Sequence, residues 1–233
     1  MTPMFRLEEV AKVYSRRATQ VVAFQTPSLE IATGDYVAIV GPSGSGKTTL
    51  LSLLGGLLSP TRGRVFLAGQ SLFDLSVTAR TRLRREKIGF VFQSFNLVPY
   101  LTAIENVQVP LYLAGVQKSD QQQRAAALLQ RVGIGDRLHH KPSELSVGQQ
   151  QRVALARTLA NNPPVILADE PTGNLDPDSR QRVLDAFAEL HRAGHTIVMV
   201  THDLSAADHA LRRLNLNGGA ICNMSAPAST RAA

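Results

Sequence analysis

Residues 41–49 read GPSGSGKTT, a glycine-rich segment between a short apolar run and a helix-forming stretch. The segment matches the pattern G-x-x-x-x-G-K-[ST], which about one random chain in a hundred of this length would match by chance. Its glycines let backbone N–H groups turn inward around phosphate oxygens, and the helix that follows adds the positive end of its dipole. We therefore predict a phosphate-binding loop between a strand and a helix.

This loop is expected to bind ATP with Mg²⁺. The ammonium of Lys47 should reach the β- and γ-phosphates, and the hydroxyl of Thr48 should bind the metal. The residues predicted to contact the nucleotide here are Gly41, Pro42, Ser43, Gly44, Ser45, Gly46, Lys47, Thr48 and Thr49.

Short apolar runs alternate with helix-forming stretches along much of the chain. Strands are predicted over residues 5–14, 21–29, 35–40, 64–67, 88–92, 165–168 and 196–200, and helices over 48–54 and 176–193. Strands that alternate with helices form a mainly parallel sheet covered on both faces, so the fold class is α/β.

A helical insertion is predicted between residues 94 and 161. It contains helix-like stretches at 103–108, 121–132 and 148–160, where Pro110 should end or kink the first and Asp120 could cap the second. The chain then forms one domain over 1–233, with a core of about 1–93 and 162–225 and a helical subdomain of about 94–161. The tail from Ala226 is expected to fray.

Two acids follow the apolar run VILA. An acid at the carboxyl end of a strand lies near the phosphate loop of a neighbouring parallel strand, so Asp169 suits the Mg²⁺ shell. Glu170 is then placed to accept a proton from an attacking water. The alternative is an ordinary charge pair at a helix N-terminus.

Two further polar residues follow strands. Gln93 comes after IGFVF and His202 after TIVMVT, where His202 could contact the γ-phosphate. Each could instead be an ordinary surface residue, but together with the loop and the acid pair they make four polar strand ends.

The segment LSVGQQQRVALAR, residues 145–157, contains a second candidate anion site. Ser146 and Gly148 open the predicted helix, and Ser146 suits its cap. Free N–H groups at a helix start bind anions, although an ordinary capped helix is the commoner case. Since one nucleotide needs only the first site, the sequence favours a dimer in which each chain's second site closes the other's first.

In order and spacing, the segments GPSGSGKTT, FVFQ, LSVGQQQ, LADEP, GNLD and VTHD resemble those of ATP-binding cassette (ABC) ATPases over almost the whole chain. The resemblance implies a P-loop core with an N-terminal antiparallel β subdomain, metal contacts from Thr48, Gln93 and Asp169, and catalytic roles for Glu170, His202 and Gln93. It also implies nucleotide contacts by Tyr14, which would stack on adenine, by Asp176 at the dimer interface, and by Ser146, Gly148 and Gln149 of the partner chain. Val147 departs from the commoner LSGGQ.

Residues 90–111 are most similar to ATPases of lipoprotein-releasing and macrolide-export systems. The resemblance implies an ATPase subunit that powers export or extrusion through a separately encoded integral membrane permease, which would dock near Gln93 to Leu113. The chain is then peripheral, at the cytoplasmic face of the inner membrane. The alternative is a soluble ABC-type ATPase acting on ribosomes or DNA.

Composition limits the partners. A lone cysteine, Cys222, rules out a disulfide within the chain, and no apolar run reaches the ~18 residues that span a bilayer. The formal net charge is +7, with the densest basic run between Arg80 and Lys87. That run is expected to be a solvated helix face or to lie near anionic lipid headgroups. No nucleic-acid partner is expected, because aromatic residues do not interleave with the basic ones.

Overall fold

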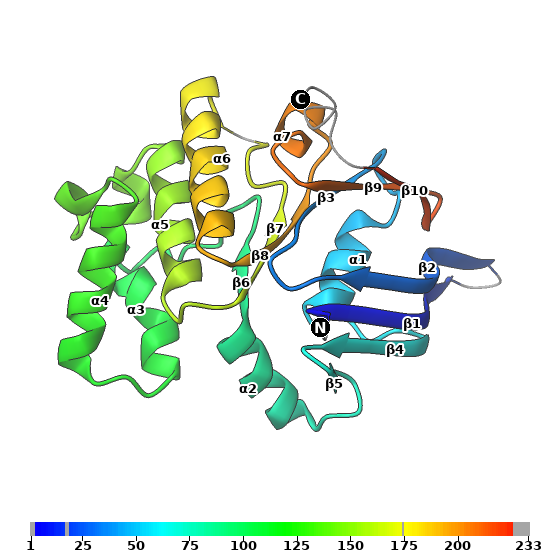
Figure 1. Cartoon of the computed structure of the whole chain (residues 1–233). Helices are drawn as coiled ribbons and strands as arrows, with labels where there is room; N and C mark the ends of the chain where they lie inside the picture. The colour runs from blue at the N-terminus through cyan, green and yellow to red at the C-terminus, as the bar shows by residue number, and fades with distance from the viewer. Residues whose placement is uncertain (1–2, 17–18, 174, 226–233) are drawn as a thin grey trace.

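The computed structural model describes residues 3–16, 19–173 and 175–225, in which one ten-stranded sheet has the order β5-β4-β1-β2-β10-β9-β3-β8-β7-β6 (Figure 1). Asn174 of the GNLD segment and the tail from Ala226 lie outside the described residues. The strands are β1 (Phe5–Arg16), β2 (Thr19–Ile31), β3 (Tyr36–Val40), β4 (Arg62–Leu67), β5 (Gln70–Ser71), β6 (Ile88–Val91), β7 (Val165–Asp169), β8 (Thr196–Val200), β9 (Arg212–Asn217) and β10 (Ala220–Ser225).

One half of the sheet is parallel and the other is antiparallel. Strands β9, β3, β8, β7 and β6 run parallel, while β1 pairs antiparallel with both β2 and β4. The runs in β3 and β8 are wholly apolar or β-branched and wholly buried, as expected for central strands covered on both faces. The predicted α/β class with an N-terminal antiparallel part is therefore confirmed.

Seven α-helices accompany the sheet in the described part of the chain. They are α1 (Lys47–Leu54), α2 (Val77–Lys87), α3 (Ala103–Leu113), α4 (Lys118–Arg131), α5 (Val147–Leu159), α6 (Pro177–Arg192) and α7 (Leu204–Ala207). Two 3₁₀ turns, η1 (Gly135–Arg137) and η2 (Pro142–Glu144), lie between α4 and α5.

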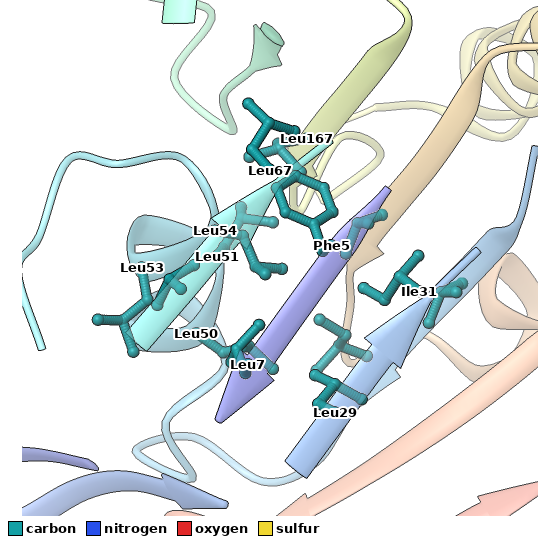
Figure 2. Packing of buried hydrophobic residues seen from close by; sticks show 14 of the residues in the cluster. Phe5, Leu7, Leu29, Ile31, Leu50, Leu51, Leu53, Leu54, Leu67 and Leu167 are labelled. Carbon is teal, nitrogen blue, oxygen red and sulfur yellow. The ribbon is translucent and has the colours of Figure 1, made fainter. Parts of the chain in front are cut away.

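Alternate residues of β3 belong to two different apolar cores, one on each face of the sheet. Val37 and Ile39 face the core that encloses α1, whereas Tyr36, Ala38 and Val40 face the core beneath α6. Figure 2 shows the first core, where the leucines of α1 lie among side chains of the β strands, including Phe5, Leu7, Leu29, Ile31, Leu67 and Leu167.

Helices α3, α4 and α5 pack on one another around a third core. Its fully buried members include Val107, Leu111, Ala125, Leu129 and Val153. These helices lie at one side of the molecule, away from α1 (Figure 1). The predicted boundaries of a separate helical subdomain, 94 and 161, remain a prediction.

The structure contradicts the expectation that the first of these helices ends at Pro110, and it contradicts the expected cap of the second. The helix α3 does not end at Pro110 but continues to Leu113, because the fully buried Val107 and Leu111 keep its inner face packed past the proline. Helix α4 begins at Lys118, and its N-cap is Gln117, so Asp120 lies in the first turn instead of capping it. There the carboxylate of Asp120 still faces the positive end of the helix dipole.

Candidate functional site

The predicted site residues follow neighbouring parallel strands at one edge of the sheet. Gly41 follows β3, His202 lies two residues after β8, Asp169 ends β7 with Glu170 next to it, and Gln93 lies two residues after β6. Since β3, β8, β7 and β6 are adjacent in this order, their carboxyl ends meet. The sheet thus brings together residues that are up to 161 positions apart in sequence, as between Gly41 and His202.

The phosphate loop is fitted tightly against two strands. A Cβ on Gly41 would lie 2.2 Å from the carbonyl oxygen of Leu216 in β9, and a Cβ on Gly46 would lie 2.2 Å from that of Ala23 in β2. Gly46 also has φ +99°, in the left-handed region that glycine adopts readily. Both positions therefore require glycine.

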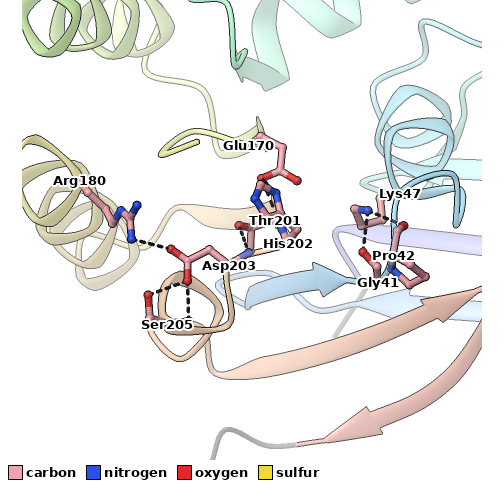
Figure 3. A network of polar contacts seen from close by, with 9 residues as sticks. All are labelled: Gly41, Pro42, Lys47, Glu170, Arg180, Thr201, His202, Asp203 and Ser205. Atoms are coloured by element: carbon pink, nitrogen blue, oxygen red, sulfur yellow. Dashed lines mark hydrogen bonds and ion pairs between the residues drawn. The ribbon is translucent and has the colours of Figure 1, made fainter. Parts of the chain in front are cut away.

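Lys47 places its charge inside the loop. Its Nζ donates to the carbonyl oxygens of Gly41 at 2.8 Å and Pro42 at 3.0 Å, and the residue is only 9% exposed (Figure 3). An ammonium has three donors, so one more remains for another acceptor. Helix α1 begins directly here with Gly46 as its N-cap and no side-chain cap bond, which leaves N–H groups free for an anion.

Thr48 and Asp169 form a pair of oxygen donors beside the loop. The Thr48 side chain lies close enough to the Asp169 carboxylate to lower its pKa. Burial raises the pKa of Asp169 above its usual range and the Glu170 carboxylate raises it further, whereas the Thr48 hydroxyl and the Lys47 ammonium act in the opposite direction. A hydroxyl and a carboxylate that lie near one another are ligands that suit Mg²⁺.

Glu170 and His202 are in direct contact. The Glu170 Oε2 lies 2.9 Å from His202 Nδ1 and accepts from the His202 backbone N–H at 3.4 Å (Figure 3). The Glu170 side chain is 15% exposed and that of His202 is 69% exposed. Glu170 has φ +46°, a conformation that costs about 1–3 kcal/mol for a residue other than glycine. The Glu170 backbone N–H donates to the Val200 carbonyl of β8 at 2.9 Å, which holds this turn in place.

Gln93 lies beside the turn that follows Glu170. A Cβ built on Gly173 would be 3.3 Å from the Gln93 Nε2, although Gln93 itself is exposed. Tyr14 lies farther along the antiparallel half, opposite Val21, and its ring is 46% exposed with the Lys12 Nζ 5.2 Å from the centroid. Tyr14 is thus available on the surface near β2, whose Ala23 faces the phosphate loop.

The second predicted anion site starts helix α5. Ser146 caps this helix as predicted, because its Oγ accepts from the Gln149 N–H at 3.3 Å while the Gln149 Oε1 accepts from the Ser146 N–H at 2.9 Å. Gly148 is buried against α6, where a Cβ would lie 2.4 Å from the Ser179 Oγ. Val147 points outward with 48% of its surface exposed.

Asp176 lies next to this helix start, as the N-cap of α6. It accepts from the Ser179 N–H at 2.9 Å, and hydrogen bonds from Ser179 hold the pKa of its carboxyl below the usual range. Helix α5 packs on α3, α4, α6 and β6, and it lies well apart from α1 (Figure 1). Within one chain, the structure therefore does not bring Ser146 and Gly148 to the phosphate loop.

A model of the family described as "ABC transporter" matches residues 24–173, more than half of the chain. The chain belongs to this family. It is an ATPase and the ATP-binding subunit of an ABC transporter.

Related proteins of known sequence or structure also belong to the ABC family. An uncharacterized ABC transporter ATP-binding protein of Thermotoga maritima is 48% identical over 95% of this chain and 94% of its own length. The macrolide export ATP-binding/permease protein MacB of Hyphomonas neptunium is 48% identical over 94% of this chain, which spans 34% of that protein. The ATP-binding cassette MJ0796, solved as a dimer in a post-hydrolysis state with ADP and Pi, superposes with a TM-score of 0.90, 41% identity and coverage of 96% and 98% of the two chains.

Some side chains that hold the ABC ATPase site together had no role in the sequence analysis. Arg180 of α6 forms an ion pair with Asp203 at 3.1 Å, and Asp203 in turn accepts from the Ser205 N–H at 2.9 Å (Figure 3). The Asp203 N–H donates to the Thr201 Oγ1 at 3.0 Å. These bonds fix the segment that contains His202 against α6. In the sequence, the aspartate of the VTHD segment was the one indication of this hydrogen-bond network.

Two residues of α5 tie that helix to the loops of the site. The Gln151 Nε2 donates to the Pro171 carbonyl at 2.9 Å, next to Glu170. Arg157 donates to the carbonyls of Phe95 and Asn96, at 2.6 Å each, just after Gln93. Burial lowers the pKa of Arg157 from its usual range. All three bonds go to backbone carbonyls, which leave no pattern in the sequence.

Proposed function

We propose that this ABC ATPase binds ATP with Mg²⁺ at the loop 41–49 and hydrolyses it between two copies of the chain, to power export or extrusion through a separately encoded membrane permease. The observation that carries the proposal is the meeting of Lys47, Asp169, Glu170 and His202 at one sheet edge, while the helix start at Ser146, a second candidate anion site, lies elsewhere.

Each residue at this edge has a proposed part in hydrolysis. Lys47 and the loop N–H groups hold phosphate oxygens, and Thr48, Asp169 and Gln93 hold Mg²⁺ directly or through water. The metal, when bound, neutralises charge on the phosphates. In the described residues no three His, Cys, Asp or Glu side chains converge on one point, so the metal would also use phosphate and water oxygens.

Glu170 is proposed as the base that takes a proton from the attacking water, oriented by its contact with His202. Glu170→Gln should retain nucleotide binding and slow hydrolysis by about 10²–10⁴-fold, which is the usual cost of losing a positioned base. Steady-state phosphate release measures the rate. Glu30→Gln, at an exposed position of β2, is the matched control and should hydrolyse at the wild-type rate. Near-normal turnover of Glu170→Gln would assign the base to another group.

The proposed dimer is head to tail, with Ser146, Gly148, Gln149 and Asp176 of one chain completing the nucleotide site of the other. It is supported by the distance between α5 and α1 within one chain and by the related cassette MJ0796, which is described as dimeric. A helix start that is already capped but exposed can still offer backbone N–H groups to a phosphate.

Light scattering on the Glu170→Gln protein tests this arrangement. The protein should be monomeric without nucleotide and with ADP, and dimeric with Mg·ATP. Adding Ser146→Arg should abolish the dimer while the monomer keeps its ATP affinity, because its own loop is intact. Adding Ser143→Arg instead, at an exposed position three residues earlier, should leave the dimer intact. A protein that remains monomeric at saturating ATP, alongside full hydrolysis by the wild type, would refute the shared site.

The membrane partner is proposed from the relatives. The MacB proteins are named as ATP-binding and permease proteins in one, and this chain spans about a third of their length. No helix in the described part of this chain is long and apolar enough to cross a membrane. A groove lined by Phe90, Phe92, Val109 and Leu113 lies between β6 and α3 and suits a docking segment of the permease. The ATPase would then be peripheral, at the cytoplasmic face, with no nucleic acid as partner.

A further inference from the structure

A groove of about 310 Å³ lies between the end of α4, the middle of α5 and α6, and contains none of the nucleotide-site residues. These three helices stand side by side (Figure 1). The floor of the groove is apolar and buried, and consists of Leu155, Leu159, Val183 and Leu190. The volume is at the lower end of the range for small-molecule sites.

Three arginines from three different helices line this groove: Arg131, Arg152 and Arg182. In the described part of the chain none of the three forms an ion pair with a carboxylate. The buried Nε of Arg152 has no hydrogen-bond partner. Burial lowers the pKa of Arg152 and the nearby guanidinium of Arg182 lowers it further, whereas the carboxylates of Asp136 and Asp176 act in the opposite direction. Two cations close together are unfavourable, and neither has an ion-pair partner in the described part of the chain, so a negatively charged ligand is favoured here.

Two acids also line the groove, Asp185 and Glu189, and both lie on α6. The Asp185 carboxylate accepts from the Gln181 Nε2 at 2.9 Å, one turn earlier on the same helix. Both acids are exposed, whereas Arg152 is half-buried. The three arginines and two acids leave a single net positive charge, which suits a ligand with one acid group and disfavours a polyanion such as ATP.

We propose that this groove binds a small organic anion, whose single acid group pairs with Arg152 and Arg182 and whose apolar body covers the leucine floor. The volume corresponds to about ten water molecules, which is room for a small aromatic acid. Arginine is well suited to the acid group, because its planar fork binds two acceptor oxygens at once.

A pair of fluorescent probes separates the charge from the apolar body. 1-Anilinonaphthalene-8-sulfonate is an aromatic monoanion, and N-phenyl-1-naphthylamine is the same molecule without the sulfonate. Both are titrated into the full chain with excess ADP present, so that the nucleotide site is occupied. The wild type should bind the sulfonate at least about tenfold more tightly, since a hydrogen bond to a charged group is worth about 1.5–3 kcal/mol, or roughly 10–100-fold.

Variants place the probes in the groove. Arg182→Met and Arg152→Met should each weaken sulfonate binding about tenfold and leave the neutral probe unchanged. Ala186→Phe, which fills the groove, should abolish binding of both probes. The matched control is Arg124→Met, an exposed arginine of α4 outside the groove, which should change neither affinity. Melting curves of each variant confirm that it folds, and Arg182→Met should not lower Tm because it removes a like-charge neighbour of Arg152.

Three results would overturn the proposal. The first is equal affinity of the wild type for the two probes. The second is unchanged sulfonate affinity in both arginine variants. The third is undiminished binding by a folded Ala186→Phe protein, because the probes would then lie elsewhere on the surface.

Discussion

The glycine at position 148 is expected to be required for packing within one chain, and not only for close approach to a partner's phosphate. A Cβ added here would lie 2.4 Å from the Ser179 Oγ and 3.1 Å from the Ser179 Cβ. Both distances are shorter than an ordinary carbon contact of about 3.5–4.0 Å. Gly148→Ala must therefore push α5 away from α6, or displace Ser179 from the first turn of α6.

The expected loss of stability in Gly148→Ala follows from two opposing effects. Inserting a methyl group into a packed contact costs about 1–3 kcal/mol, while alanine gains up to about 1 kcal/mol over glycine in a helix. The net loss in the free energy of unfolding is about 1–2 kcal/mol. For a chain of this size that lowers Tm by about 2–8 °C.

Substituting Ser179 by smaller residues should restore the stability lost in Gly148→Ala in steps. Ser179→Ala removes only the oxygen at 2.4 Å, so Gly148→Ala/Ser179→Ala should recover partly. Ser179→Gly also removes the Cβ at 3.1 Å, so Gly148→Ala/Ser179→Gly should recover most of the contact. Relative to the sum of the single changes, the last double variant should gain about 1–2 kcal/mol.

Urea unfolding of the four proteins in each cycle measures the coupling, and steady-state hydrolysis measures the site. If the clash matters, ATPase activity lost in Gly148→Ala returns in Gly148→Ala/Ser179→Gly. A coupling energy within about 0.5 kcal/mol of zero, together with an unchanged Tm for Gly148→Ala, would refute the steric argument. Recovery of stability without recovery of activity would assign Gly148 to the partner's phosphate instead.

Three further outcomes are expected. By analogy with base stacking, Tyr14→Ala should weaken ATP binding by about 1–3 kcal/mol, measured by calorimetry. The control Tyr112→Ala should bind ATP as the wild type does. Equal ATP affinities of Tyr14→Ala and the wild type would show that Tyr14 does not contact the base. Tyr100 is 84% exposed, and Tyr100→Glu should abolish stimulation of the ATPase by the purified permease without lowering the basal ATPase rate. The control Leu211→Glu should be stimulated like the wild type. Full stimulation of Tyr100→Glu would place permease docking elsewhere. Burial raises the pKa of Asp169 in the folded chain, so ionisation of this carboxyl opposes folding. Asp169→Asn should therefore raise Tm in EDTA at pH 7, and this gain in Tm should vanish below about pH 4, where the carboxyl of the unfolded chain is protonated as well. An equal gain in Tm at pH 3.5 would contradict the raised pKa.

The parallel half of the sheet was predictable because its strands are short, apolar and bounded by polar residues. The segment 196–200 was predicted with its observed bounds, and 165–168 to within one residue. The polar residues after these strands were placed correctly at one edge, since parallel strands end together. What the pattern could not show was the strained φ of Glu170 or its contact with His202, because both depend on neighbouring strands.

Three other elements were not predicted, two of them although the sequence contains a signal for them. The strands β9 and β10 carry a visible hairpin signal, with Leu214 and Leu216 alternating with polar residues before the pair Gly218–Gly219. Both glycines have positive φ, as the tight turn of a hairpin requires. Helix α2 buries Leu83 as its single buried side chain among the described residues, so its apolar periodicity is too weak to detect. Its basic face is nevertheless the one predicted as a solvated helix.

The fork of Arg157 has a mechanical consequence. One planar guanidinium holds two adjacent backbone carbonyls, those of Phe95 and Asn96, through two of its N–H groups. Helix α5 is about 20 Å long, with Ser146 capping one end and Arg157 near the other. Because the helix is held at both ends, we expect a displacement of its capped end to move the carbonyls that follow Gln93, and a displacement of that loop to move Ser146.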